Sequence, residues 1–354
     1  MMRILPFCLA LLAAALPFPT LATVGEQDAA PQAAQNNASQ AIESESVLAL
    51  KALQLLDQRV HTAGYRLVSA NAAYCKETVP NTGLLLHDIQ QYGDSAAARF
   101  AHGFASDIAV NAVAPRSPAA EAGVQVGDGL IAVDGIAVED VAIDAEKLDD
   151  EQPEYRRIAT IGAMLAKAAA DGSMMLSVIR GGVEQDIELK PVQTCPSQFQ
   201  IRVSDDREAA ADGKMVSISS TLAEYVLDEG ELAAIAAHEL AHNLLDHRER
   251  LDDQGVNRGF FGQFGKSAGR IKATEIEADR LSVWLMANAG YDPQSAVRFW
   301  TRYGQQYDKG IFSASTHYRW KKRVELFEEE MAKMAEMKPL DGKYAPPLLA
   351  GMAQ

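Results

Sequence analysis

Two histidines and a glutamate between residues 238 and 242 have the spacing of a metal-dependent hydrolytic site. His238 and His242 stand four residues apart, and Glu239 directly follows the first histidine. On a helix, residues four apart lie on one face, so both imidazoles can bind the same zinc ion. Glu239 lies one step round the helix, where it can reach a metal-bound water without binding the metal. The pattern predicts a catalytic zinc site, and the alternative is a buried helix whose histidines are satisfied by hydrogen bonds.

The segments around these residues have the composition of helices that could position them. Residues 231–237 are rich in Ala and Leu, and neither Gly nor Pro occurs again before Gly255. A second predicted helix ends at Gly290 and places Glu275 and Asp279 four residues apart on one face. We expect Glu275 to be the third zinc ligand and Asp279 to accept the free ring N–H of a ligand histidine. The alternative for these acidic residues is a solvated stripe.

Several motifs near these residues resemble the M48 family of zinc metallopeptidases, which includes the HtpX, Oma and CAAX prenyl protease types. The resembling segments follow one another in the order 211–218, 237–242, 275–279, 289–300 and 315–323. The resemblance implies an α+β fold with a mostly helical, gluzincin-type peptidase domain and a small edge-exposed sheet. It also implies one zinc ion per chain, hydrolysis of peptide bonds, and an edge strand at 215–218 that holds the substrate as an added strand.

The resemblance gives roles to two residues outside the zinc ligands. His317 would donate to the oxyanion of the tetrahedral intermediate, or would instead occupy the open position on zinc. Arg323 would be the charge partner or structural partner of His317. Tyr318 replaces the proline that is usual in this motif, so the loop around His317 is expected to be looser. The alternatives are a surface histidine and a salt bridge on the last helix. His247 lies off the ligand face and is expected to support or pack against the site.

Residues 113–135 resemble the central part of a PDZ domain, a small β-barrel or sandwich that binds extended peptides. We predict that this domain spans 78–193, with a helix near 155–170 and strands near 174–180 and 184–190. Its candidate carboxylate loop, 83–86, lacks the second glycine of the usual Gly-Leu-Gly-Phe pattern. Whether the domain captures peptide C-termini therefore stays open, and the alternative is a module that only packs against the peptidase.

The remaining segments predict an exported protein. Residues 1–22 have a short basic start, an apolar stretch and small residues for cleavage, which is typical of a signal peptide. Residues 23–42 are rich in Ala, Gln, Asn and Ser and are predicted to be a disordered linker. An apolar stripe predicts a helical segment at 43–77 that docks on the peptidase domain, which spans 194–354. We expect the periplasm of a Gram-negative bacterium as the location.

The net charge of the chain bears on its binding partners, and its cysteines bear on the redox state of its compartment. The net charge of −15 argues against nucleic acid and anionic membranes, and no apolar run after the signal peptide is long enough for an integral membrane span. Unfolded or extended polypeptides are the expected partners. After signal removal only Cys75 and Cys195 remain, which predicts one disulfide in an oxidising compartment. The alternative is two buried free thiols.

Two functions fit these patterns. The first is an exported zinc endopeptidase that acts on damaged or misfolded envelope proteins. The second is a peptide-binding or chaperone-like protein without catalysis, which retains a vestigial zinc site. The presence of Glu239 favours the endopeptidase, because a purely structural zinc site has no use for a carboxylate beside the first histidine.

Overall fold

The computed structural model describes residues 29–143, 153–256, 265–307 and 319–350. The chain divides into two units, residues 1–45 and 46–354. Apart from the first part of the N-terminal helix, the features below belong to the second unit. The predicted signal peptide and His317 lie outside the described residues. The described chain combines helices with sheets, so the α+β prediction is confirmed.

The N-terminal helix α1 (Ala29–Ala70) is long, and its residues from Leu56 to Val68 pack into the core of the peptidase half of the second unit. Its buried residues include Val60 and Leu67, and the ring of Phe199 fits against the backbone at Gly64. The linker prediction for 23–42 was wrong over most of its length, because the helix already begins at Ala29. Ala and Gln are good helix formers, and the run of small and polar residues therefore continues the helix.

The predicted PDZ-like segment forms an antiparallel sheet with strand order β2-β3-β4-β6-β7 and β5 paired to β4. Helices α2, α3 and α4 accompany it, and α4 and the strands around it share one apolar core. The predicted helix near 155–170 and the two strands after it are present as α4, β6 and β7. The bounds are β2 (Leu84–Asp88), α2 (Ser95–His102), β3 (Ile108–Val113), α3 (Pro118–Glu121), β4 (Gly129–Val133), β5 (Ile136–Ala137), α4 (Pro153–Ala169), β6 (Met174–Arg180) and β7 (Val183–Leu189).

A two-stranded sheet connects the PDZ-like segment to the peptidase half. Strands β1 (Val79–Asn81) and β8 (Val192–Thr194) pair antiparallel where the chain enters and leaves the segment. The predicted disulfide between Cys75 and Cys195 is present, with a Cα–Cα distance of 5.6 Å. It closes a loop that contains the whole PDZ-like sheet, so both ends of the segment are held together.

The peptidase half contains a three-stranded sheet with the order β10-β11-β9. Strand β11 (Met215–Ser219) pairs parallel with β9 (Gln198–Arg202) and antiparallel with β10 (Ala209–Ala211). The prediction that 215–218 forms the exposed edge was therefore wrong, because β11 is the central strand and β10 is the edge. Gly213 has φ +104° and makes the tight turn between β10 and β11. The Ala run of β10 has low β propensity and gave no strand signal.

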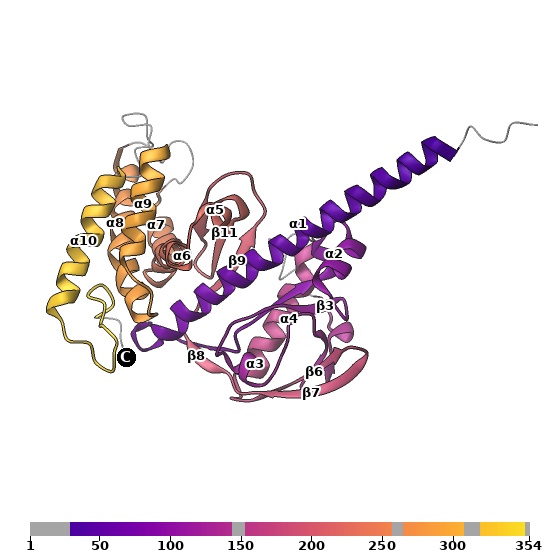
Figure 1. The fold of residues 1–354 in the computed structure, drawn as a ribbon. Helices are drawn as coiled ribbons and strands as arrows, with labels where there is room; N and C mark the ends of the chain where they lie inside the picture. The colour runs from indigo at the N-terminus through magenta and orange to yellow at the C-terminus, as the bar shows by residue number, and fades with distance from the viewer. Residues whose placement is uncertain (1–28, 144–152, 257–264, 308–318, 351–354) are drawn as a thin grey trace, which may run out of the picture. The chain divides into compact units, whose positions relative to one another are not determined.

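Helices form the rest of the peptidase half (Figure 1). After α5 (Ser220–Tyr225) the chain forms α6 (Glu229–Leu244), α7 (His247–Asp253), α8 (Gly265–Asn288), α9 (Gln294–Tyr307) and α10 (Trp320–Glu336). Helix α6 packs against α8 and α9 on one side and against β10 and β11 on the other. It is thus the central element of the peptidase half, and it carries the two predicted histidine ligands. None of the helices that the structure describes contains an apolar stretch of the length that a membrane span needs.

Candidate metal centre and cleft

Helix α6 has a capped N-terminus and small buried side chains that allow close packing. Its N-cap residue Asp228 accepts a hydrogen bond from the Glu231 backbone N–H at 2.8 Å, which satisfies one of the free donors of the first turn. Ala233, Ala236 and Ala237 are fully buried, and their small side chains let α8 and the sheet approach the helix axis. The two histidines of the metal motif follow in the next turns and face α8.

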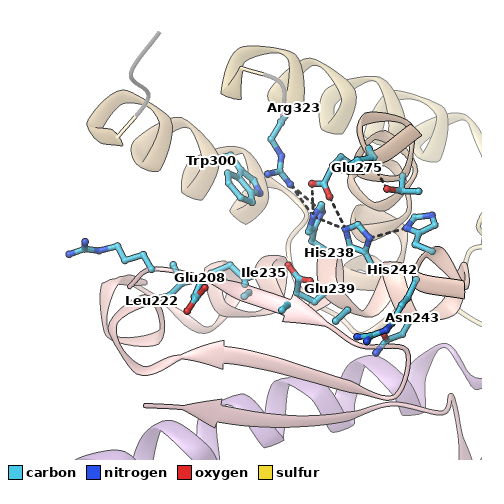
Figure 2. Close-up of a pocket in the computed structure, with 18 of the residues that line it drawn as sticks. Glu208, Leu222, Ile235, His238, Glu239, His242, Asn243, Glu275, Trp300 and Arg323 are labelled. Carbon is cyan, nitrogen blue, oxygen red and sulfur yellow. Dashed lines mark hydrogen bonds and ion pairs between the residues drawn. The ribbon is translucent and has the colours of Figure 1, made fainter. Parts of the chain in front are cut away.

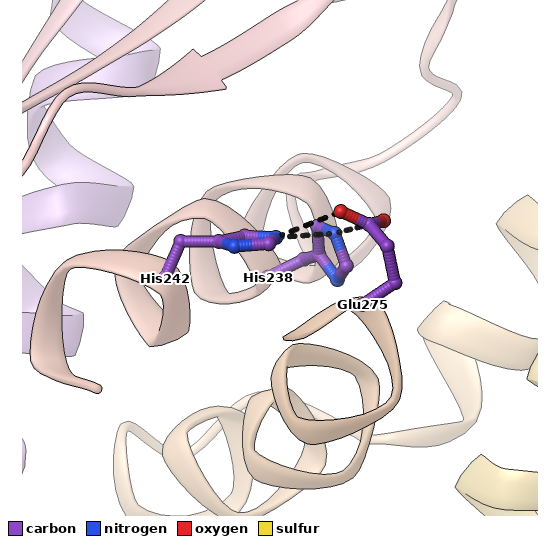
Figure 3. Close-up of side chains that lie close together, drawn as sticks. All are labelled: His238, His242 and Glu275. Atoms are coloured by element: carbon purple, nitrogen blue, oxygen red, sulfur yellow. Dashed lines mark hydrogen bonds and ion pairs between the residues drawn. The ribbon is translucent and has the colours of Figure 1, made fainter. Parts of the chain in front are cut away.

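Three donor groups from α6 and α8 converge at one point (Figure 3). His238 Nε2 and His242 Nε2 lie 3.3 Å apart. Glu275 on α8 places Oε2 3.5 Å from His238 Nε2 and Oε1 3.4 Å from His242 Nε2. Ligand atoms about 2.0–2.1 Å from a tetrahedral zinc ion lie roughly 3.3–3.4 Å from one another. The donor set and its spacing therefore fit one zinc ion with a fourth position left for water or substrate.

Asp279 orients the first histidine. Its Oδ1 lies 3.0 Å from His238 Nδ1, and its carboxylate is completely buried. A guanidinium has no proton acceptor, so of the two neighbours of Nδ1 only Asp279 can accept its proton. In the neutral His238 ring, this arrangement puts the proton on Nδ1 and leaves Nε2 available at the metal position. Asp279 would then have the orienting role that the sequence predicted for it.

The Arg323 guanidinium lies beside His238, between Trp300 and Glu275 (Figure 2). It forms an ion pair with Asp279, and its guanidinium carbon lies 3.4 Å from the centre of the Trp300 ring. Only 5% of the Arg323 surface is exposed. These contacts hold Asp279 in place, so among the described residues Arg323 is a structural partner of the histidine support. The contact with His317 that the resemblance implied involves a residue outside the described part of the chain.

His247 orients the second histidine through a chain of hydrogen bonds that the sequence did not specify. Its Nδ1 lies 2.9 Å from His242 Nδ1, and its Nε2 lies 2.9 Å from Glu277 Oε2. Arg250 in turn donates to Glu277 at 2.7 Å. The hydrogen bond from His247 lowers the pKa of Glu277 to about 2, so this carboxylate is ionised and accepts the ring N–H. The only sequence signal for this contact was the position of His247 after the motif.

The titration of the three donors reflects their burial and their neighbours. Burial and the nearby His238 lower the pKa of His242 to about 3, so this imidazole is neutral. Burial also acts on His238, but hydrogen bonds to Asp279 and Glu275 outweigh it and raise the pKa of His238 to about 9. Nε2 of His238 would have to lose its proton before it could bind a metal ion. Burial of Glu275 is outweighed by its hydrogen bond to His238, and its pKa lies well below the usual range.

Glu239 lines a cleft of about 560 Å³ that also contains the three donors (Figure 2). Burial raises the pKa of Glu239 to about 7, so the group can both take and return a proton near neutral pH. One wall of the cleft is the edge strand β10, and another is the aromatic face of α9, where Phe299, Trp300 and Tyr303 lie. Sequence reasoning did not identify this aromatic wall or the role of β10.

Family models match two segments of the chain. Residues 189–272 match the model described as Peptidase family M48, and residues 109–180 match a PDZ domain. The matched peptidase segment contains His238, Glu239 and His242 and ends just before Glu275.

Two curated proteins are similar over part of their length. The mitochondrial metalloendopeptidase OMA1 of Schizosaccharomyces pombe is 32% identical over 122 residues, which is 28% of this chain and 36% of that protein. A putative beta-barrel assembly-enhancing protease of Vibrio cholerae is 26% identical over 144 residues, which is 33% of this chain and 30% of that protein. The chain thus spans about a third of the length of these relatives. Residues 189–272 are thus similar to peptidase family M48, and residues 109–180 are similar to a PDZ domain.

Proposed function

We propose that this protein is a zinc-dependent endopeptidase whose zinc ligands are His238, His242 and Glu275. The observation that carries the proposal is the convergence of these three donors beside Glu239, in a cleft bordered by an exposed strand edge. A chaperone-like protein with a vestigial site would have no need for the carboxylate of Glu239 at this position.

In the proposed hydrolysis, one residue transfers protons and others orient the metal ligands. A zinc ion held by the three donors would act as a Lewis acid that lowers the pKa of water and polarises the scissile carbonyl. Glu239 accepts a proton from the attacking water at its carboxylate and passes it to the nitrogen of the leaving amine. A pKa near 7 suits both transfers. Asp279 and His247 keep the two imidazoles in the tautomers that leave Nε2 free.

The edge strand β10 supports a polypeptide substrate in extended form. It is the outer strand of its sheet, and Ala209, Ala210 and Ala211 line the cleft. An added strand is held through main-chain hydrogen bonds and does not depend on the sequence of the substrate. The short Ala side chains leave room for substrate side chains on either face of the strand. We therefore assign to β10 the role that the sequence had assigned to 215–218.

We also propose that the protein acts in the periplasm on proteins of the cell envelope. The signal-peptide pattern at 1–22 and the disulfide between Cys75 and Cys195 support an oxidising, exported location. The name of the Vibrio relative, a putative beta-barrel assembly-enhancing protease, supports the envelope as the place where substrates are found.

The test compares Glu239→Gln with Glu249→Gln, a control that makes the same change at an exposed position on α7. Glu239→Gln should retain zinc, measured by metal analysis, and should cleave unfolded casein about 10²–10⁴-fold more slowly. The control should cleave at the wild-type rate. Cleavage by Glu239→Gln within a factor of about three of wild type would reject the mechanism. A wild-type protein that binds zinc but does not cleave unfolded proteins would favour the chaperone-like alternative.

A further inference from the structure

Two exposed arginines line the metal cleft without a carboxylate partner. Arg207 stands two residues before the start of β10, and Arg248 directly follows His247 on α7. Both residues are exposed. In the part of the chain that the structure describes, neither arginine has a carboxylate within salt-bridge distance. The cleft therefore offers two positive charges that the described chain does not neutralise.

The other charged side chains of the cleft have partners or belong to the metal centre. Glu208 forms an ion pair with Arg202, and Arg323 forms one with Asp279. The chain as a whole has a net charge of −15, which disfavours acidic ligands in general. Attraction of an acidic segment to the cleft would therefore have to come from a local group such as one of the two arginines.

Arg207 lies on the continuation of the edge strand β10. The Glu208 carbonyl accepts from the Ser219 N–H at 2.9 Å, so pairing with the end of β11 extends one residue beyond the start of β10. Side chains two positions apart in an extended segment point to the same face, so Arg207 shares a face with Ala209, which packs against the peptidase core. The Arg207 side chain thus lies on the helix side of the sheet, where it borders the cleft.

Arg248 lies toward the other end of the cleft. The Gly213 N–H, just after β10, donates at 2.7 Å to the side chain of Asn243 in the last turn of α6. Helix α7, which carries Arg248, begins shortly after this turn. Figure 2 shows Glu208 and Asn243 on opposite sides of Glu239. A polypeptide along β10 would therefore meet one arginine on each side of the reacting bond.

Two tyrosine rings hold Arg207 and leave its hydrogen-bond donors free. The guanidinium carbon lies 5.0 Å from the centre of the Tyr307 ring and 5.5 Å from that of Tyr225. The Tyr225 hydroxyl donates to Gln306 at 2.8 Å, which fixes one of these rings. Contact with a ring face attracts the cation but does not use its five N–H donors. Arg207 can therefore form two parallel hydrogen bonds with a carboxylate.

The direction of the added strand decides which part of a substrate meets Arg207. Antiparallel pairing is slightly more stable than parallel pairing, so we place the substrate antiparallel to β10. It then runs from Ala211 toward Ala209, and the residues after the scissile bond approach Arg207. Neighbouring side chains of a strand point to opposite faces, so only alternate positions of the substrate can reach the guanidinium.

We infer that Arg207 is a specificity-determining residue that binds a carboxylate of the substrate on the C-terminal side of the scissile bond. The carboxylate belongs to an aspartate or glutamate side chain, or to the C-terminus of the polypeptide. The inference rests on the proposed strand addition at β10 and names the class of segment that the cleft prefers. Arg207 acts away from the reacting atoms, so it contributes to the binding of the substrate.

Binding is measured by fluorescence anisotropy on the zinc-loaded Glu239→Gln protein. The fluorescein-labelled peptides have a central leucine pair, flanks of alanine and serine, and a C-terminal carboxamide. Glutamate, glutamine or lysine is placed in the C-terminal half, and a second set carries the same residues in the N-terminal half. In the first set, glutamate should lower the dissociation constant by about threefold or more relative to glutamine at about 50 mM salt. At about 500 mM salt this difference should shrink, because salt screens exposed charges.

Three variants separate charge recognition from a structural role of Arg207. Arg207→Gln should abolish the difference between the glutamate and glutamine peptides. Arg207→Glu should reverse it, so that the lysine peptide binds more tightly than the glutamate peptide. A purely structural role would weaken all peptides equally and leave their ratios unchanged. Arg248→Gln is the matched control, because it removes an exposed arginine at the other end of the same cleft and should keep the wild-type ratio.

A further peptide, with glutamine in the C-terminal half and a free C-terminal carboxylate, distinguishes the two sources of the carboxylate. If it binds like the glutamate carboxamide and loses this advantage in Arg207→Gln, the terminus is recognised as well. If it binds like the glutamine carboxamide, Arg207 reads side chains only.

Three results would overturn the inference. The first is an unchanged ratio of the glutamate and glutamine peptides in Arg207→Gln. The second is an Arg207-dependent preference for glutamate in the N-terminal half, which would contradict the antiparallel placement. The third is absence of binding by every peptide. The proposed hydrolysis is tested separately by casein cleavage. A wild-type protein that fails to cleave casein would reject that function, while the binding ratios would still decide the role of Arg207.

Discussion

Replacement of His247 tests the hydrogen-bond support of the proposed metal site. If His242 binds the metal through Nε2, its Nδ1–H must donate to His247 Nδ1 across the 2.9 Å contact. The His247 ring then carries its proton on Nε2 and donates it to Glu277, also at 2.9 Å. His247 is 2% exposed, so water cannot easily replace it.

The His247→Phe variant keeps an aromatic ring but removes both hydrogen bonds. The Nδ1–H of His242 then loses its acceptor in a buried place, and the imidazole loses the contact that fixes its orientation. Loss of such a supporting partner typically costs about 10–100-fold in metal affinity, or roughly 1.4–2.7 kcal/mol. His247→Gln retains one acceptor and one donor in a single group, so it should recover part of this loss.

Zinc affinity is measured by competition with a chromophoric chelator at pH 7.5, after melting curves show that each variant is folded. His102→Phe is a suitable control, because His102 is a buried histidine of the PDZ-like half whose ring nitrogens have no hydrogen-bond partner among the described residues. It should bind zinc like the wild type. A His247→Phe protein with a zinc dissociation constant within about twofold of the wild-type value would refute the proposed support.

Two further predictions concern stability. Burial raises the pKa of Asp57 from 3.8 to about 7, so the folded state binds more protons than the unfolded state between these values, and stability should fall as pH rises. From pH 5 to pH 7 wild type should lose up to about 1.4 kcal/mol per pH unit relative to Asp57→Asn in urea unfolding, and parallel pH profiles would contradict this. Gly64→Ala should destabilise the protein by about 1–3 kcal/mol, because its Cβ would lie 2.2 Å from the Phe199 ring. Gly162→Ala, where the space is open, should instead stabilise its helix by about 0.5–1 kcal/mol. If both variants changed the free energy of unfolding in the same direction, the packing argument would be rejected.

Local patterns were sufficient to predict the helix that carries His238, Glu239 and His242, because helical spacing and composition are properties of neighbouring residues. The same holds for α4, β6 and β7, which have clear apolar periodicity and a Gly-Gly turn between the strands. The start of α1 was misjudged because a polar, Ala-rich run is compatible with either a helix or a linker until the structure shows which one forms.

Strand pairing could not be read in this way. The segment 215–218 has the composition of a strand, but its place in the sheet depends on β9 and β10, which pair with it on either side. The Ala residues of β10 carry no strand signal, although their backbone borders the cleft. The contact of His247 with His242 likewise needed the orientation of α7 relative to α6.

Residue spacing was enough to predict the chemistry proposed for this protein. The prediction used two histidines at helical spacing with a glutamate beside them, a distant glutamate and aspartate with the same spacing, and a pair of cysteines around a PDZ-like segment. The strand edge that borders the cleft, and the contacts by which His247 and Arg323 hold the imidazoles, could be seen only in the folded chain. These features differ in how far apart along the chain the residues that produce them lie. Spacing along one helix is fixed by local backbone geometry, whereas sheet order, burial and contacts between helices depend on the packing of residues far apart in the chain.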